Sequence, residues 1–325
     1  MTGKPGDSSP IVTRLVAPGE VVDQVATVLQ RAWPAPVIHY SLDYCGWQFR
    51  FPGAQPTLMA ATFDGDRVVG VMAAVPRRMA LGARVENVCL LSFLGVDPDY
   101  RRRGIARELY RVLLPEISRR ELVMMVFAKT NTAGLGLIES EPTALGFHGV
   151  SLGDYVIHGF MARGGDAPMK VEVCQDVSSL QFADAGPTML ASRPDLLQLQ
   201  HYAVGEHQRI AVVRNEAGAV AGAAVVNHSR YVNQRGLEWT TIVDSFLIAP
   251  TSADALKSLL TYAATEFAED GAPALCTVPN VSGLDPEWFR PVGLRRTATS
   301  YSGIVYSMDA EHPMLAARRT NLEIA

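Results

Sequence analysis

Apolar positions in the first half of the chain follow two periods, one typical of helices and the other of strands. Apolar residues at helical spacing between Val21 and Ala32 predict a first helix that ends before Pro34. A second helical stripe runs from Ile105 to Ile117. Continuous or alternating apolar runs predict strands over residues 58–63, 68–75, 84–96, 122–128 and 154–160, with a hairpin turn at residues 64–66.

Two further segments of the first half are less regular. Thr130, Asn131 and Thr132 predict the cap of a short helix that ends near Ala144. Residues 33–56 hold many aromatic residues among proline and glycine, and no period is evident. We expect a long ordered loop here, which either covers the core or lines a ligand pocket.

The stretch from residue 88 to residue 106 combines a strand, a turn and the start of a helix. Pro98 stops the strand, because proline has no N–H to donate to a neighbouring strand. Arg101, Arg102 and Arg103 follow, and the helical stripe begins directly after Gly104. Unpaired N–H groups and the positive end of the helix dipole meet at such a point, so this turn is a predicted anion site. Gly104 would let the backbone approach a phosphate closely.

The string Arg101-Arg102-Arg103-Gly104-Ile105-Ala106 resembles the Arg/Gln-x-x-Gly-x-Gly/Ala loop of the GNAT acyltransferase superfamily. The resemblance extends over residues 11–161 and implies a mixed α/β fold, in which helices flank a twisted, mostly antiparallel sheet. It also implies that acetyl-coenzyme A or another acyl-coenzyme A is the cosubstrate, with its pyrophosphate in this loop, and that no metal is needed. Leu94, Gly95 and Val96 would pair with the pantetheine arm, in a splay between this strand and the strand that ends near Ala128. Asn131 and the Leu145-Gly146-Phe147 turn resemble the second motif of the family.

The second half of the chain repeats the first at an offset of about 150 residues. Val220 to Ala224 matches Val68 to Met72, Ser245 to Leu247 matches Ser92 to Leu94, Asn280 matches Asn131, and Val292 to Leu294 matches Leu145 to Phe147. We therefore predict two tandem GNAT-like domains, residues 11–163 and 170–310, joined by a linker at residues 164–169. Residues 1–10 are expected to form a disordered tail, and residues 311–325 a second tail.

The second repeat lacks the anion site. Thr251 to Ala255 enters a helix directly, without arginine or glycine, and Asp254 would repel a phosphate. We interpret this half as a degenerate repeat that no longer binds coenzyme A. Its expected use is to pack on the first half and to complete the acceptor pocket, since ligand sites favour domain interfaces.

The composition narrows the function classes further. A chain of 325 residues with 48% apolar residues fits one large or two ordinary domains, and a net charge of −4 argues against a general nucleic-acid binder. No apolar run reaches the roughly 18 residues that a membrane helix needs, and the polar N-terminus does not resemble a secretion signal. We expect a cytoplasmic protein with reduced, buried thiols at Cys89 and Cys276, and the oligomeric state stays open. No Cys-x-x-Cys or His-x-x-x-His pattern indicates a metal site.

The resemblance says less about the residues that move protons. Many family members carry a glutamate on the strand before the loop and a tyrosine on the last helix, but residues 89–92 contain no carboxylate and residues 139–143 contain no tyrosine. Ser92 and Glu139 are our candidate catalytic residues, with Glu141 and His148 as further candidates, and a chain of water molecules could also serve. Asp244 interrupts an apolar strand, where it either caps a domain contact or orients an acceptor amine.

The resemblance predicts transfer of an acetyl group from acetyl-coenzyme A to an amine of a small molecule, through a tetrahedral intermediate. Two alternatives stay open. The first is decarboxylation of a malonyl thioester or transfer of acyl groups to a carrier protein, and the second is binding of acyl-coenzyme A without catalysis. Residues 149–153 also match the Gly-x-Ser-x-Gly pattern of serine hydrolases, but that pattern needs a strand before it and a helix after it. The predicted strand over residues 154–160 argues against a hydrolase.

Overall fold

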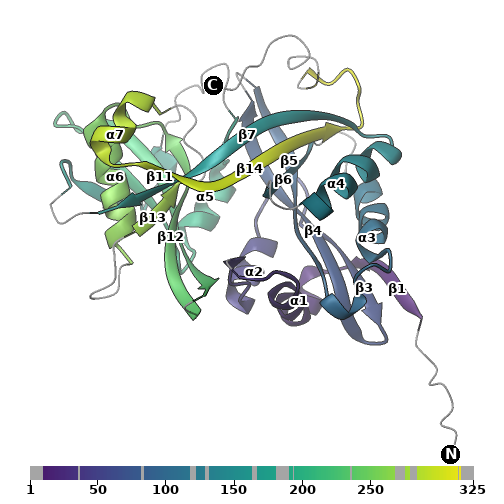
Figure 1. Cartoon of the computed structure of the whole chain (residues 1–325). Coiled ribbons are helices and arrows are strands. Elements are labelled where there is room, and N and C mark those ends of the chain that lie inside the picture. The colour runs from purple at the N-terminus through teal and green to yellow at the C-terminus, as the bar shows by residue number, and fades with distance from the viewer. Residues whose placement is uncertain are drawn as a thin grey trace, which may run out of the picture.

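The chain folds into two lobes that two long strands connect (Figure 1). The computed structural model describes residues 10–35, 37–81, 84–117, 122–128, 132–162, 167–180, 190–192, 194–234, 236–267, 275–278, 284–313 and 315. We refer to residues 11–161 as the first half and to residues 167–313 as the second half. Among the described helices, none is long and apolar enough to cross a membrane.

The elements of the first half follow most of the predicted pattern. They are β1 (Ile11–Val16), α1 (Pro18–Ala32), β2 (Val37–Ile38), α2 (Leu42–Phe49), β3 (Leu58–Asp64), β4 (Arg67–Leu81), β5 (Arg84–Val96), α3 (Ile105–Leu113), β6 (Leu122–Ala128), α4 (Thr132–Ala144) and β7 (His148–Met161). The predicted helices are confirmed as α1, α3 and α4, and the predicted strands as β3 to β6. The strand predicted over residues 154–160 is wrong at its start, since β7 begins at His148 and contains Ser151. The Gly-x-Ser-x-Gly match is therefore not a nucleophile turn between a strand and a helix.

Residues 33–56 are not the loop that the sequence predicts, because they contain helix α2. Ser41 caps this helix, and its hydroxyl accepts a hydrogen bond from the amide of Tyr44 at 3.1 Å. Cys45 and Phe49 lie one turn apart on its buried face. The helix has eight residues and includes Gly46, so its apolar period is too short and too interrupted to be read from the sequence.

The second half repeats the element order that the first half shows from α2 onward. Its elements are β8 (Val171–Val173), β9 (Leu190–Ser192), α5 (Leu196–Ala203), β10 (Gln208–Arg214), β11 (Val220–Asn233), β12 (Gly236–Ile248), α6 (Ala253–Thr265), β13 (Leu275–Val278), α7 (Phe289–Val292) and β14 (Arg295–Ser307). The matched sequence segments occupy equivalent places, β4 with β11 and β5 with β12. Gly146 and Gly293, which follow α4 and α7, both adopt left-handed backbones with φ of 88° and 92°. Asn131 and Asn280 lie outside the described residues.

The two halves share one continuous sheet because their last strands change places. The strand order is β1-β3-β4-β5-β6-β14-β7-β13-β12-β11-β10-β8. β14, from the second half, pairs with β6 of the first half, and β7, from the first half, pairs with β13 of the second half. Along this order only β5–β6 and β12–β13 are parallel, so each half has the mostly antiparallel sheet expected from the sequence. Figure 1 shows β7 and β14 crossing side by side from one lobe to the other.

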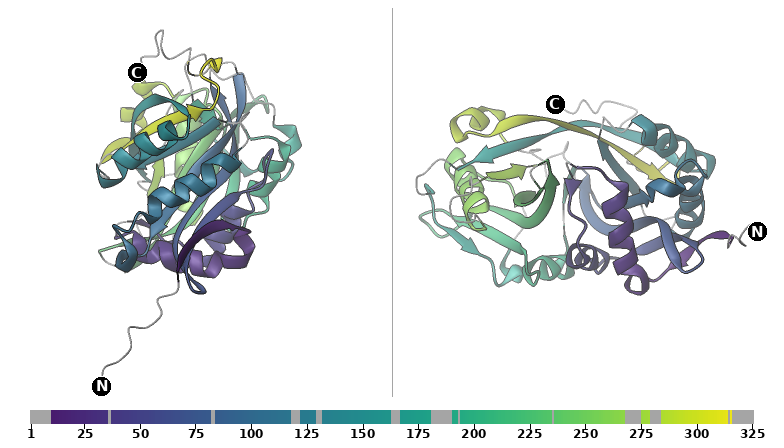
Figure 2. Two further views of the ribbon diagram at one scale, coloured as in Figure 1. Left: turned by 90° about the vertical axis from the view of Figure 1, so that its right-hand side faces the viewer. Right: turned by 60° about the horizontal axis from the view of Figure 1, so that its bottom comes forward.

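Alternate residues of the central strands enter different cores, which places the helices on opposite faces of each half-sheet. In β3 and β4, Ala60 and Met72 pack with α3, whereas Ala61 and Val71 pack with α1 and α2. The helices α3 and α4 therefore cover one face and α1 and α2 the other (Figure 2). In the second half α6 covers the outer face and α5 the inner one.

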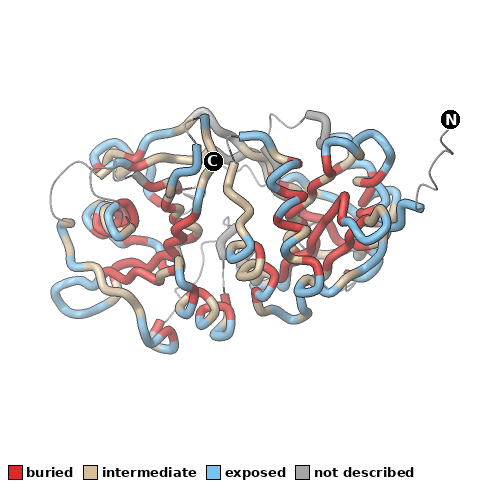
Figure 3. The backbone as a smooth tube through the Cα atoms, turned by 90° about the horizontal axis from the view of Figure 1, so that it is seen from below, coloured by how far each residue is buried: buried red, intermediate tan, exposed pale blue. Residues whose placement is uncertain are grey.

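One hydrophobic core belongs to both halves. It joins residues of α1, α2, β3, β4 and β5 to residues of α5, β10, β11 and β12. Leu199 and Tyr202 of α5 are among its buried members, with 3% and 2% of their surface exposed. Figure 3 shows buried backbone in both lobes, and this shared core joins the inner faces of the two half-sheets. Leu315, in the segment predicted as a tail, is also buried, against residues of β5, β6 and β14.

Candidate active site

The edge of the first half-sheet opens next to the predicted coenzyme loop. β5 and β6 run parallel and pair from Val88–Leu122 to Leu91–Met125, where their pairing ends. β5 nevertheless continues to Val96. In the part of the chain that the structure describes, residues 92–96 therefore have no strand neighbour on the β6 side. This is the splay that the GNAT resemblance implies.

A β-bulge interrupts β5 within this open edge. The ladder between β4 and β5 passes from the pair Ala73–Ser92 to the pair Val71–Gly95, which leaves one extra residue in β5. Phe93 adopts a φ of +57°, an uncommon and costly backbone for a residue with a side chain, of the kind that clusters at functional sites. Such bulges re-aim backbone groups beside active sites. A main-chain N–H turned out of the ladder here can polarise the carbonyl of a bound thioester.

Asp97 fixes the turn that follows β5. Its side chain is 1% exposed and forms ion pairs with Arg67 at 2.6 Å and with Arg31 at 2.8 Å. It also accepts a hydrogen bond from the amide of Asp99 at 3.1 Å, which starts the short 3-10 turn Pro98–Tyr100. A buried carboxylate with several partners holds its loop rigidly, so the basic segment after it has a defined position.

Helix α3 begins with main-chain N–H groups that no side chain caps. Its N-cap residue is Gly104, with a φ of +80° and no side-chain cap, and Arg102 is also left-handed, with a φ of +63°. A Cβ atom on Gly104 would meet no heavy atom within 4 Å. The first amides of a helix lack partners inside the helix, and alternating backbone conformations of this kind form anion-binding concavities.

The three arginines of this loop have no carboxylate partner within the described part of the chain. Arg102 is exposed. Arg103 lies over the ring of Tyr100, with its guanidinium carbon 4.9 Å from the ring centroid. Arg101 donates only to main-chain carbonyl groups. Uncompensated guanidinium groups beside a helix N-terminus match the diphosphate of a coenzyme A thioester in both charge and hydrogen-bonding chemistry.

The equivalent helix of the second half has no such site. Ser252 caps α6, and its hydroxyl accepts a hydrogen bond from the amide of Ala255 at 3.1 Å. Asp254 adds a negative charge in the first turn. An amide that is already bonded and a carboxylate that repels anions both oppose phosphate binding, which is the difference that the sequence predicts between the repeats.

A pocket borders the open edge of β5 on the α1 side. Trp33 and Arg101 form part of its wall. The indole N–H of Trp33 donates to the carbonyl oxygen of Leu94 at 3.0 Å, and Arg101 donates to the carbonyl oxygens of Val96 and Ala32. These side chains therefore occupy main-chain acceptors that the resemblance assigns to the pantetheine arm.

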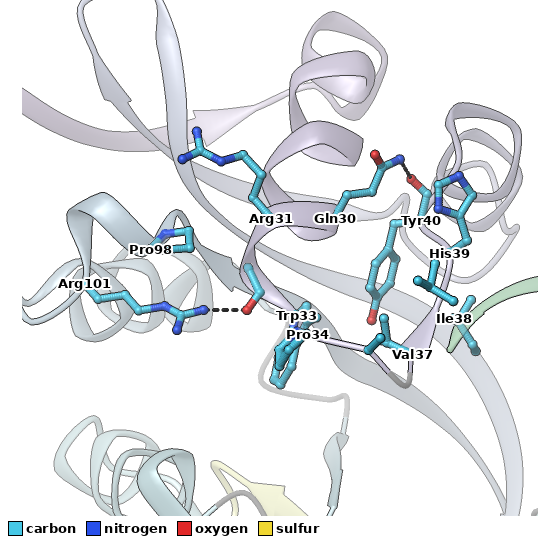
Figure 4. A pocket seen from close by; sticks show the side chains of 13 residues that line it. Gln30, Arg31, Trp33, Pro34, Val37, Ile38, His39, Tyr40, Pro98 and Arg101 are labelled. Atoms are coloured by element: carbon cyan, nitrogen blue, oxygen red, sulfur yellow. Dashed lines mark hydrogen bonds between the residues drawn. The ribbon is translucent and has the colours of Figure 1, made fainter. Parts of the chain in front are cut away.

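The pocket has a volume of about 570 Å³, which lies within the range of small-molecule sites. Figure 4 shows Arg101 and Pro98 at one end and Tyr40 and His39 at the other, with Trp33 between them. The rest of the wall is formed by Gln30, Arg31, Ala32, Pro34, Ala35, Val37, Ile38 and, from the second half, Val232. The second half thus contributes Val232 to the wall of this pocket.

The structure does not bring the candidate catalytic residues together. Ser92 is half-buried in β5, directly before the bulge, whereas Glu139 is exposed in the middle of α4. Within the described residues they share no hydrogen bond. Glu141 is buried and bound to α3, and His148 is exposed at the start of β7. Ser92 is the candidate closest in sequence to the open strand edge.

Glu141 connects the helices α3 and α4. Its carboxylate forms ion pairs with Arg107 at 2.6 Å and with Arg111 at 3.7 Å. We expect Glu141→Gln to lower the free energy of unfolding by about 1.5–3 kcal/mol, the range for hydrogen bonds to charged groups, and to leave the affinity for coenzyme A unchanged. Urea unfolding and calorimetry measure the two quantities. A large loss of turnover in a variant of normal stability would contradict this structural role.

Asp244 lies among residues that the sequence does not connect with it. The hydroxyl of Tyr202, in α5, donates to its carboxylate at 3.3 Å, and Arg77, in β4, is a charged neighbour. Burial is the main cause of the raised pKa of Tyr44, in α2. The negative charge of Asp244 raises this pKa further, because the two residues lie near each other. The sequence gives one sign of the cluster formed by Asp244, Tyr202, Arg77 and Tyr44, which is that Asp244 is a polar residue in an apolar run.

The sequence of this chain is similar to those of known acyltransferases. Residues 22–140 match the family model described as the acetyltransferase (GNAT) family. A stretch of 98 residues, 30% of this chain, is 30% identical to a probable glycylpeptide N-tetradecanoyltransferase of Caenorhabditis elegans and spans only 21% of that protein.

Solved structures resemble the whole chain. A structure of Saccharomyces cerevisiae N-myristoyltransferase with bound myristoyl-CoA has a TM-score of 0.64 at 11% identity, and the match covers 94% of this chain and 87% of that one. A second structure of the yeast enzyme with myristoyl-CoA has a TM-score of 0.63 at 13% identity, and the match covers 94% of this chain and 82% of that one. At such identities the likeness concerns the fold.

Proposed function

We propose that the chain, whose residues 22–140 match the model of the acetyltransferase (GNAT) family, transfers an acyl group from acyl-coenzyme A to an amine. The observation that carries this proposal is the arrangement around α3. A strand with an open edge and a bulge leads into a rigid turn, three arginines that have no carboxylate partner among the described residues, and a helix whose N-cap residue is a glycine. These features suit the thioester, the pantetheine arm and the diphosphate of one ligand, in that order along the chain.

The proposed chemistry uses the main chain of the bulge. An N–H group near Phe93 would polarise the thioester carbonyl and stabilise the oxyanion of the tetrahedral intermediate. The amine nitrogen forms a bond to the carbonyl carbon, the carbon–sulfur bond breaks, and the thiolate takes up a proton. We propose Ser92 as a donor toward the thioester, because it directly precedes the bulge. Glu139 is proposed as a base that acts through water, because its carboxylate lies on the exposed face of α4.

The acyl group that we propose is acetyl, and the acceptor is an amine of a small molecule. A second candidate is a longer acyl chain. The pocket of about 570 Å³ beside the strand edge favours this candidate, and the relatives reported above are named as acyltransferases of tetradecanoyl or myristoyl groups.

Mass spectrometry of reaction mixtures tests the proposal. The protein is incubated with acetyl-, octanoyl- or myristoyl-coenzyme A and a library of primary amines, and we expect free coenzyme A together with one amide product. The preferred thioester decides between the two acyl candidates. Loss of carbon dioxide from malonyl-coenzyme A without an amide would instead favour a thioester decarboxylase. Binding of the thioester without any turnover would favour a non-catalytic protein.

A further inference from the structure

The carboxylate of Asp244, next to the shared core, receives few hydrogen bonds. In the ladder between β11 and β12, Val226 pairs with Val243 and Val225 pairs with Ser245, so Asp244 is the extra residue of a bulge. The hydroxyl of Tyr202 is its one hydrogen-bond donor among the described residues. A carboxylate can accept about four hydrogen bonds, and Asp244 retains a partly exposed surface.

Arg77 is the cation whose charge acts on Asp244, and no ion pair between them is found among the described residues. Arg77 donates to Gln48 Oε1 at 2.7 Å, and its guanidinium carbon lies 3.8 Å from the centroid of the Phe51 ring. Burial raises the pKa of Asp244, and the charge of Arg77 only partly opposes that effect. A cation bound beside this carboxylate would favour its charged form.

Aromatic rings extend from this carboxylate toward the open edge of β5. The ring of Tyr44 lies 6.3 Å from the ring of Phe93, the bulge residue, and 6.3 Å from the ring of Tyr40. Tyr40 also forms one end of the pocket. Rings of this kind attract cations through their π faces, and Tyr40 and Tyr44 are both partly exposed.

The position of Asp244 suits a charge that does not react. An amine must lose its proton before it can attack a thioester, and an ion pair with a carboxylate holds an amine in its charged form. Asp244 belongs to β12, in the second half, whereas the strand edge proposed for the thioester belongs to β5, in the first half. A carboxylate in this place is suited to a second nitrogen of the acceptor, while the first nitrogen attacks.

We infer that the Asp244 carboxylate, together with the partly exposed ring of Tyr44, binds a second, positively charged nitrogen of the acceptor, which is therefore a diamine or a polyamine. The inference rests on the proposed acyl transfer and adds the class of acceptor to it. Asp244 is in this account a specificity-determining residue.

Steady-state kinetics with three primary amines of similar length test the inference. Putrescine carries a second ammonium group, aminobutanol carries a hydroxyl group instead, and butylamine carries neither. The wild-type protein is expected to show a KM for putrescine about tenfold to a hundredfold below the other two. Asp244→Asn is expected to remove this preference, with KM for acyl-coenzyme A unchanged. Asp254→Asn, an exposed carboxylate of the same half, is the matched control and should behave as wild type.

Stability provides a readout that separates binding from a structural role. A carboxyl group whose pKa is raised in the folded state stabilises the fold below its unfolded pKa, near 3.9, and loses that contribution as the pH rises through the folded pKa. Asp244→Asn removes this loss, so at pH 7 the variant should resist urea at least as well as wild type. The groups around Asp244 that could alter this result are Arg77, Tyr202 and Tyr44.

The outcomes distinguish the inference from the proposed function. If wild type acylates no amine at all, the proposed function fails. If wild type acylates amines without preferring putrescine, or if Asp244→Asn keeps the preference, the inference fails alone. A variant that loses stability while its KM for putrescine stays unchanged also overturns it, because Asp244 would then be a structural residue. Should Asp244→Asn not fold, Tyr202→Phe, which removes the one hydrogen bond to the carboxylate, is expected to weaken putrescine binding by a smaller factor.

Discussion

Replacing Gly104 with valine is expected to weaken coenzyme A binding by at least about a hundredfold without unfolding the protein. Gly104 has a φ of +80°, and open space lies where its Cβ would be. A valine at this position would fill the space that we assign to the diphosphate and would strain the backbone that aims the first amides of α3. The loss of two hydrogen bonds to a charged group, each worth about 1.5–3 kcal/mol, accounts for the expected factor.

Gly218 offers a matched control in the second half. It has a φ of +79° and equally open space at its Cβ position, and it lies in the turn between β10 and β11. Gly218→Val should cost about the same stability as Gly104→Val, roughly 1–2 kcal/mol for a left-handed residue with a side chain. Isothermal titration calorimetry should show normal coenzyme A affinity for Gly218→Val. Equal affinities in both variants would contradict the assignment of the loop.

Tyr306→Ala is expected to destabilise the protein by about 3–5 kcal/mol, the usual cost of truncating a large aromatic residue in a core. Tyr306 is 2% exposed, and its hydroxyl donates to the carbonyl oxygen of Ile138, in α4, at 2.9 Å. It lies in β14 opposite Gly149 of β7 and Val123 of β6. This side chain from the second half therefore completes the core of the first half.

Gly149 provides the matching test of the strand exchange. A Cβ atom on Gly149 would lie 2.5 Å from the Tyr306 ring, so Gly149→Ala should cost about 1–3 kcal/mol through overpacking. In the Tyr306→Ala background the same change should cost almost nothing, because the cavity accepts the methyl group. Urea unfolding of the four proteins gives the interaction energy. Additive costs would mean that β7 and β14 are not neighbours.

The sequence predicts the elements of this fold well where the hydrophobic pattern is local. β5 and β6 have the predicted boundaries because continuous apolar runs end at Asp97 and after Ala128. The exchange of β7 and β14 could not be predicted, because an apolar run shows that a strand is buried but does not identify its neighbour. Helix α2 was missed because two turns with a glycine give too little period.

In the candidate site, too, the features formed by adjacent residues could be predicted, and those formed by distant segments could not. The loop that we propose for the diphosphate could be singled out because Gly104 and the arginines are adjacent in the sequence. The bulge could not be predicted, because phenylalanine rarely adopts a positive φ and its presence therefore gives no sign of one. Asp244 could be singled out as a polar residue in an apolar strand, but its partners Tyr202 and Arg77 come from α5 and β4. Contacts between distant segments determine that cluster, and they become visible only in the folded chain.

A crystal structure of the protein with coenzyme A or a non-hydrolysable thioester analogue tests the central claim most directly. We expect the diphosphate to accept hydrogen bonds from main-chain amides around Gly104, with the pantetheine arm along Leu94 to Val96 in place of the Trp33 indole and the Arg101 guanidinium. A ligand bound at the start of α6, or a diphosphate that makes no contact with residues 102–106, would contradict the account.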